Sequence, residues 1–281
     1  MAGRAGIIIH TEEDFIGLRA AGRLAAETLD MITDYVRLGV TTGGLDRIIH
    51  EYTLAHGAVP GPLNYRGYPK SCCISVNHVV CHGIPGERPL IEGDIVNIDV
   101  TPKLNGWFGD TSRMYSVGKV SIKATKLVDT TYECLMRGIE VVKPGATLGD
   151  IGHAIQSHAE KHRYSIVTDF CGHGIGRTFH AEPNVLHYGK PGTGLKLKAG
   201  MVFTIAPMLN IGKPDVKILE DEWTAVTRDR SLSAQLEHML AVTATGYQLF
   251  PPSPAAYTHP PYRPHGEARP LPPPPPPCPP P

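Results

Sequence analysis

The chain has 281 residues, and its 27 acidic side chains balance 27 basic ones to a formal net charge of zero. Hydrophobic residues make up 41% and charged residues 19% of the sequence, which is typical of a globular protein that buries a substantial core. The balanced charge gives no nucleic-acid signature, and no apolar run approaches the roughly 20 residues of a membrane span.

The cellular compartment follows from the N-terminus and the cysteines. The apolar stretch at 7–9 is too short for a signal peptide. The six cysteines are scattered without the spacing of a disulfide framework or a zinc knuckle. We therefore expect reduced thiols and a cytoplasmic protein without a membrane partner.

The body of the chain reads as helices alternating with strands. Apolar residues at helical spacing predict helices over 11–37, from Thr42 through Tyr52, over about 122–142 and over 148–162. Apolar or alternating runs predict strands over 95–101, 107–116, 201–206 and 234–243.

A weak internal repeat links the two halves of this pattern. Gly39-Val40-Thr41 recurs as Gly145-Ala146-Thr147, 106 positions later. In each copy a helix ends, a Gly-x-Thr turn follows and another helix begins. The repeat predicts two related halves, about 1–118 and 119–250, packed as one domain over 1–250. The matches are few, so chance similarity is the competing explanation.

Residues 251–281 differ from the rest, because they hold 16 of the 27 prolines. Such a segment is expected to be extended polyproline or disordered and not to pack on the core. We favour a spacer without a partner over a ligand for a proline-binding module.

The segment Gly93–Tyr115 carries the most informative pattern. Asn105-Gly106 predicts a type I′ hairpin turn, which pairs Thr101 with Asp110 and places Asp99 as a diagonal neighbour of Asp110 on one face. Two converging carboxylates repel unless a cation neutralises them. The alternative is a turn residue and a surface charge. Asp99 argues against it, because a charge inside the apolar run 95–100 needs a partner.

Two histidines and a glutamate are further candidates. His173 and His180 lie in the glycine-rich segment 170–180, which does not fit a dinucleotide fingerprint. A lone histidine is more often structural, but a nearby carboxylate pair favours a site. Glu237 lies inside an alternating strand and needs a cation or a donor if that strand is buried. His82, in a Cys-His-Gly-Ile-Pro turn, carries little information alone.

Together these segments resemble the type I (bacterial-type) methionine aminopeptidases. CHGIP, GDIVNIDV, GDTSRMY, CGHGIGRTFH, FTIxPM and SAQLEH occur in that family's order, and the resemblance spans roughly 10–248. It implies an α/β (α+β) pita-bread fold, with two pseudo-symmetric halves around a curved antiparallel sheet and flanking helices. Residues 1–250 would then form a methionine aminopeptidase-like catalytic domain.

The resemblance also implies a two-metal site. Asp99 would bind one ion, Asp110 and Glu237 would bridge, and His173 would complete the other. The oxygen-rich ligand set suits Mn²⁺, Fe²⁺ or Co²⁺, with Zn²⁺ as a further option. His180 would stabilise the developing gem-diolate and His82 would hydrogen-bond the scissile amide. The positions that match the methionine pocket are Tyr65, Tyr68, Cys73, Phe179 and Trp223.

The implied activity is removal of the initiator methionine from new proteins with a small second residue. The partners would be nascent polypeptide N-termini at the ribosome, and the enzyme would be a cytoplasmic monomer.

Three positions depart from the family's pattern. The family reads FTIEPM where this chain has Ala206, so a metal-ligand glutamate is missing. Pro62 stands where the pocket often has cysteine, and Glu222 replaces a common glycine. Two interpretations therefore compete: an aminopeptidase impaired by Ala206, and a catalytically crippled relative that binds peptide or a protein partner.

Overall fold

The computed structural model of the protein describes residues 6–250 and 253–263. Its helices are α1 (Glu12–Thr33), α2 (Thr42–Ala55), the short η1 (Tyr65–Gly67), α3 (Ile122–Glu140) and α4 (Leu148–Lys161). Its strands are β1 (Val59–Pro60), β2 (Cys73–Val76), β3 (Val79–Cys81), β4 (Ile95–Val100), β5 (Pro102–Leu104), β6 (Trp107–Phe108), β7 (Thr111–Ser116), β8 (Ser165–Ile166), β9 (Gly172–Gly174), β10 (Ala181–Val185), β11 (Val202–Ile205), β12 (Met208–Asn210), β13 (Val216–Ile218), β14 (Ala225–Thr227), β15 (Ser233–Gln235), β16 (Glu237–Val242) and β17 (Tyr247–Leu249).

All four predicted helices are present, and each begins at a hydroxyl N-cap. The cap side chain accepts a hydrogen bond from the backbone N–H three residues later, which satisfies one orphan donor of the first turn; the caps are Thr11, Thr41, Ser121 and Thr147. α1 ends at Thr33, earlier than predicted, because Tyr35 and Val36 continue to pack on the core after the backbone has left the helix. None of the helices in the described ranges is both long enough and apolar enough to cross a bilayer.

The repeated Gly-x-Thr turns have the same local geometry. Gly39 and Gly145 have φ of 80° and 89°, a left-handed conformation that glycine adopts without strain. The threonines at the third positions cap α2 and α4, which are both 14 residues long. The pairs α1–α2 and α3–α4 are therefore local structural equivalents.

An eight-stranded sheet with antiparallel pairing occupies the centre, in the order β10-β9-β11-β16-β7-β4-β2 with β17 paired to β16. Its β4–β7 hairpin has the predicted register, because Asp99 faces Ser112. Asn105 and Gly106 have φ of 51° and 83°, as a type I′ turn requires. The hairpin is interrupted after Val100, where β5 and β6 leave the sheet; they pair with each other, and β5 also pairs with β1.

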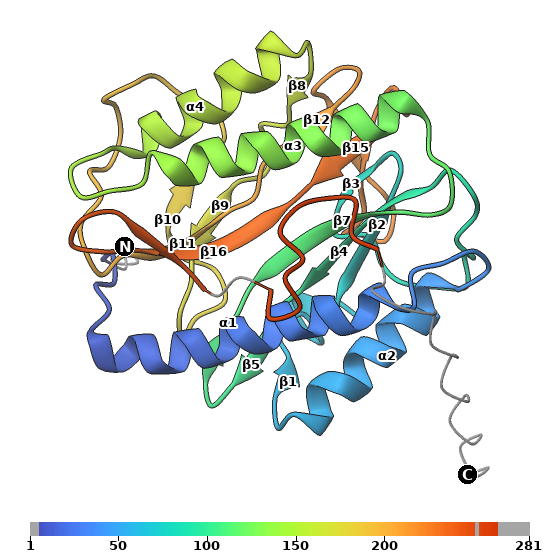
Figure 1. The fold of residues 1–281 in the computed structure, drawn as a ribbon, viewed down its shortest axis with the longest axis horizontal. Coiled ribbons are helices and arrows are strands. Elements are labelled where there is room, and N and C mark those ends of the chain that lie inside the picture. Colours follow the sequence, from blue (N-terminus) through green and yellow to red (C-terminus); the bar gives the residue numbers. More distant parts are fainter. Residues whose placement is uncertain (1–5, 251–252, 264–281) are drawn as a thin grey trace.

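The two helix pairs pack on this sheet at separate places. Figure 1 shows α3 and α4 on one side of the view, α1 and α2 on the other, and the long strands β16, β7 and β4 between them. α1 contacts β4 and β7, whereas α3 contacts β11, β12 and β15. A large apolar core lies between helices and sheet, and it contains Leu29, Ile49, Ile98, Ile155 and Phe203, each at most 1% exposed.

Residues 253–263, which we name the C-terminal strap, return to this core. Tyr262 is only 5% exposed and belongs to the large apolar cluster. The prediction that 251–281 does not pack on the core is wrong for the strap. Although the segment is rich in proline, it also contains Tyr257 and Tyr262, whose side chains pack on the core. Residues 251–252 and 264–281 lie outside the described residues.

A buried ion pair anchors the strap. Arg113 Nη1 lies 2.7 Å from Asp30 Oδ1, and both side chains are at most 10% exposed. The ring centroids of Tyr257 and Tyr262 lie 5.5 and 5.1 Å from the guanidinium carbon of Arg113, within the range of cation–π attraction. The Ser253 hydroxyl also donates to Asp30, at 2.6 Å. The strap thus covers an ion pair between α1 and β7.

Candidate active site

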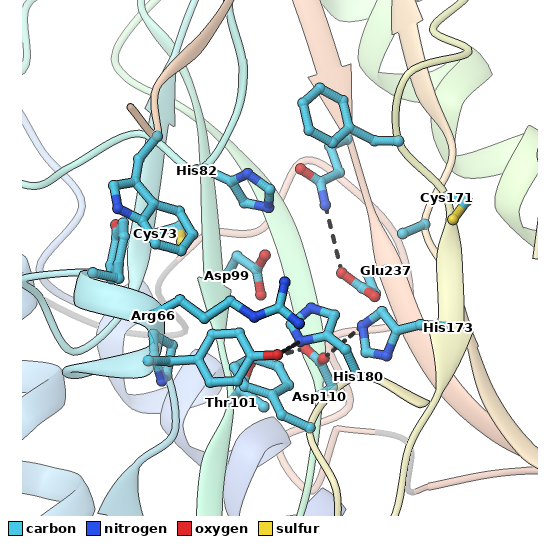
Figure 2. A pocket seen from close by; sticks show the side chains of 18 of the residues that line it. Arg66, Cys73, His82, Asp99, Thr101, Asp110, Cys171, His173, His180 and Glu237 are labelled. Carbon is cyan, nitrogen blue, oxygen red and sulfur yellow. Dashed lines mark hydrogen bonds and ion pairs between the residues drawn. The ribbon is translucent and has the colours of Figure 1, made fainter. Parts of the chain in front are cut away.

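A cavity of about 650 Å³ collects side chains from neighbouring strands of the central sheet (Figure 2). Cys73 faces Asp99, Asp99 faces Ser112, and Ser112 faces Glu237 across β2, β4, β7 and β16. Residues directly opposite each other in a sheet point to the same face. Since Ile205 faces His238, the next step of that register places Ala206 opposite Glu237. This row of neighbouring residues therefore contributes Cys73, Asp99, Glu237 and Ala206 to the lining of the cavity.

The predicted metal ligands come together in this cavity. One ligand atom from each of Asp110, His173 and Glu237 lies within 4.8 Å of the other two. Asp99 lines the same cavity, on the same face as Asp110, as the hairpin register predicts. The Thr101 hydroxyl donates to Asp110 Oδ1 at 3.1 Å and so fixes that carboxyl group.

Three carboxyl groups in so small a volume perturb one another. Burial, and then the charge of Glu237, raises the pKa of both Asp99 and Asp110 well above its usual range. Burial raises the pKa of Glu237 to about 7. The three carboxyl groups would ionise readily at neutral pH only if a positive charge were bound between them. Divalent cations prefer such oxygen ligands, so the donor set fits a metal centre.

His173 supplies an independent sign of a cation. Its Nδ1 lies 3.1 Å from the carbonyl oxygen of Gly174, which can only accept, so Nδ1 carries the proton. Burial lowers the pKa of His173 to about 4, so the ring is neutral and Nε2 presents a lone pair. That lone pair faces Asp110 Oδ2 at 3.6 Å. A lone pair that faces a carboxylate, with the other nitrogen held by a carbonyl, is the usual arrangement of a metal-binding imidazole.

Comparison with known proteins agrees with this geometry. Residues 17–244 match metallopeptidase family M24. The methionine aminopeptidase of Rickettsia prowazekii is 60% identical over 257 residues, which cover 91% of this chain and 99% of that protein. The chain belongs to the type I methionine aminopeptidases. The methionine aminopeptidase of Escherichia coli K12 is 52% identical over 245 residues, covering 86% of this chain and 93% of that enzyme.

Solved structures support the same fold. The crystal structure of the Rickettsia methionine aminopeptidase superposes with a TM-score of 0.86 over 87% of this chain and 99% of that one. The predicted pita-bread fold is thereby confirmed. The prolidase of Pyrococcus horikoshii superposes with a TM-score of 0.70 at 19% identity, covering 86% of this chain and 63% of that one, so it shares the fold alone.

The two predicted catalytic histidines also line the cavity (Figure 2). His180 Nδ1 lies 3.0 Å from the Tyr65 hydroxyl, and burial lowers the pKa of His180 to about 3. When the hydroxyl donates to Nδ1, Nε2 of the neutral ring carries the proton and is a hydrogen-bond donor. His82 has a left-handed φ of 56°, and burial lowers its pKa as well. A non-glycine residue held in that conformation is typical of functional sites.

An aromatic wall forms another part of the cavity. The Tyr68 and Trp223 rings meet edge to face at a centroid distance of 5.1 Å, and Tyr65 lies 4.9 Å from Phe179. Burial raises the pKa of the Cys73 thiol well above its usual range, so Cys73 stays protonated. Such a wall suits an apolar, polarisable side chain.

The three departures from the family's pattern differ in position. Ala206 and Pro62 line the cavity. Glu222 is exposed in a turn, with φ of 65°, and lies outside the set of residues that line the cavity. A left-handed φ is one that glycine adopts without strain, which fits the glycine that the resemblance implies at this position. Ala206 contributes no oxygen to the cavity, and its backbone N–H donates to Nε2 of the buried His187 at 3.1 Å.

Sequence reasoning did not single out several other cavity residues. They come from loops whose position depends on the fold, or from strands with no distinctive motif: Arg66, Thr101, Asp169, Phe170, Cys171, Ala181, Glu182, Asn184, Met208 and Gln235. Arg66 offered one signal, since it follows Tyr65 in a segment that also carries the pocket aromatics. Its φ of 49° is visible only in the structure.

Proposed function

We propose that this chain removes the N-terminal methionine from peptides with a small second residue, in a metal-dependent reaction. The observation that carries the proposal is the lone pair of His173 facing Asp110 Oδ2 at 3.6 Å, within a cluster that also includes Glu237. Such a set of one imidazole and several carboxylates suits a divalent cation. The catalytic unit would be 1–250, with halves 1–118 and 119–250.

The metal site would hold two divalent ions. Asp99, Asp110, His173 and Glu237 would hold these ions. Mn²⁺, Fe²⁺ or Co²⁺ suits this oxygen-rich set, and Zn²⁺ is an alternative. The bound metal would polarise the peptide carbonyl and lower the pKa of a water molecule.

The histidines and the aromatic wall would act on the substrate. The methionine side chain would lie against Tyr65, Tyr68, Cys73, Phe179 and Trp223, and the cost of leaving these apolar surfaces in water would favour its burial. Neutral His180, with its Nδ1 held by Tyr65, would donate from Nε2 to the carbonyl oxygen as negative charge develops there. His82 would hydrogen-bond the scissile amide and hold it against the nucleophile.

Ala206 should weaken this activity. The register places it opposite Glu237, where a longer acidic side chain would point into the cluster. Without that carboxylate one ion has one anionic ligand fewer and binds more weakly. The attacking water also loses a general base, which is typically worth ~10²–10⁴ in rate.

Turnover of the peptide Met-Ala-Ser tests the function. The protein is stripped with a chelator, and free methionine is measured before and after addition of Mn²⁺, Fe²⁺ or Co²⁺. We expect release only with metal, and none from Glu237→Gln, which keeps the size of the side chain and removes its charge. Equal release with and without metal would contradict the proposal.

Ala206 also favours a second candidate function, which is peptide or protein binding without turnover. The aromatic wall and both histidines line the cavity, so this candidate expects peptide affinity without the missing carboxylate. This candidate predicts that Met-Ala-Ser binds, measured by calorimetry, but is not cleaved with any of the three metals.

The substrates would be the N-termini of nascent chains in the cytoplasm, as they leave the ribosome. The free thiols of Cys72, Cys73, Cys81, Cys134 and Cys171 support a reducing compartment. All these groups belong to one chain, so a monomer suffices for activity.

A further inference from the structure

A second cluster of potential metal ligands lies on the α3–α4 pair, apart from the active-site cavity. It consists of Glu133 from α3 and His158 and His162 from the C-terminal end of α4. One ligand atom of each lies within 4.8 Å of the other two. None of the three lines the active-site cavity.

Helix geometry brings these side chains together. His158 and His162 are four residues apart, so they lie on the same face of the helix and its cap. Their ring centroids are 4.5 Å apart. His158 Nε2 lies 2.5 Å from Glu133 Oε2, across the contact between the two helices. Two imidazoles and a carboxylate thus face one point.

The burial of the cluster suits a site that closes on an ion. The His158 side chain is 8% exposed and is therefore fixed, whereas the Glu133 side chain is 51% exposed and His162 is exposed. Ligand atoms around a tetrahedral Zn²⁺ lie about 3.3 Å apart, given Zn–N bonds of about 2.0–2.1 Å. The ligand atoms of the cluster, all within 4.8 Å of one another, lie close to that spacing, and its two exposed side chains are those with room to adjust.

The charges around the cluster are of both signs. Asp129 lies one turn before Glu133, and Glu140 lies on the same helix; Arg137 lies one turn after Glu133, and Lys161 precedes His162. The His158 side chain also faces Glu133 Oε2 directly, so the carboxylate and the imidazole are already in contact.

The other half of the chain provides an internal comparison. The residues 106 positions earlier are Glu27, Tyr52 and His56. His56 caps α2 as His162 caps α4, and its ring lies 4.0 Å from the Tyr52 ring. Tyr52 replaces His158, so this half has the same arrangement with only one imidazole. Of these two equivalent positions in the described residues, the one on α3 and α4 therefore carries two imidazoles and a carboxylate.

We propose that Glu133, His158 and His162 form a second metal site, which binds Zn²⁺ independently of the active site. Two imidazole nitrogens and one carboxylate oxygen are a known zinc ligand set, with a fourth position left for water. The two nitrogens favour Zn²⁺ over Mg²⁺ or Ca²⁺, which prefer oxygen ligands.

Equilibrium dialysis of the full chain against ZnCl₂ tests this site, with bound zinc counted by mass spectrometry. We expect His162→Ala to hold one zinc per chain fewer than the parent. His56→Ala is the matched control, because it removes the corresponding cap histidine of the other half, and it should bind as much zinc as the parent. Equal zinc binding by the parent and His162→Ala would overturn the proposal.

A residue-specific measurement complements the count. Diethyl pyrocarbonate should modify His162 more slowly with Zn²⁺ than with Mg²⁺, because a ring nitrogen bound to a metal is not free to react, while modification of His56 should not change. Glu133→Gln should weaken zinc binding by about tenfold or more, since loss of even an outer-shell partner of a metal costs roughly 10- to 100-fold. Equal modification rates of His162 in the two metals would reject the site, whatever the result for peptide turnover.

Discussion

Tyr262→Ala should destabilise the protein substantially, although Tyr262 lies in a proline-rich segment. Its side chain is 5% exposed and packs in the main core beside Arg113. A buried aromatic side chain removes about 150–250 Å² from water, which at roughly 25 cal/mol per Å² gives an upper limit of about 4–6 kcal/mol. The alanine side chain still buries some apolar area, and the surrounding core relaxes in part around the cavity. We therefore expect Tyr262→Ala to lower the free energy of unfolding by about 2–4 kcal/mol.

For a domain of this size that loss lowers Tm by roughly 5–15 °C. The assay is thermal unfolding of the full chain. Tyr247→Ala is the matched control, because Tyr247 is 36% exposed on β17, and it should shift Tm by at most about 2 °C. If Tyr262→Ala melts as Tyr247→Ala does, the strap does not belong to the folded core.

Three further predictions concern the active site. In the metal-free protein the pKa of Glu237 is raised from 4.5 to about 7, so the folded state binds this proton more tightly than the unfolded state does. Protonation of Glu237 therefore stabilises the fold by roughly 3 kcal/mol at pH 4, and this stabilisation is lost as the pH rises through 7. Mn²⁺ should therefore raise Tm more at pH 7.5 than at pH 5, and an equal rise would contradict the cluster's role. Tyr65→Phe should lower kcat about tenfold with little change in KM, because His180 loses the group that fixes its proton on Nε2; an unchanged kcat would exclude this role. Added formate should raise Met-Ala-Ser turnover by the parent but not by Ala206→Glu, since it supplies the missing carboxylate; no effect on the parent would argue against a vacant ligand position.

Patterns fixed by local chemistry were visible in the sequence. The N-caps and the Asn105-Gly106 turn depend on residues a few positions apart, and the turn alone set the register that places Asp99 beside Asp110. The aromatic pocket and the ligand set came from family motifs rather than from spacing. That the ligands meet depends on the order of strands, which no local pattern encodes.

Other features needed the fold. The tautomer of His173 depends on the carbonyl of Gly174, and Ala206 directly follows Ile205, the last residue that β11 pairs with β16. The sequence did not predict the packing of the strap, because the high proline content is a property of the whole segment 251–281. The packing depends on two of its residues, Tyr257 and Tyr262, which contact Arg113. Contacts between single residues that are far apart in the chain produce no periodic pattern in the sequence from which they could be predicted.

The central claim is that this site is a metal-dependent aminopeptidase that lacks one ligand at position 206. Parent and Ala206→Glu are compared at saturating Mn²⁺, because the added carboxylate would repel Glu237 without a cation. The measurement is kcat for Met-Ala-Ser, with peptide affinity determined in parallel. We predict that Ala206→Glu is faster by ~10²–10⁴ in kcat with similar affinity; equal kcat for the two forms would contradict the claim.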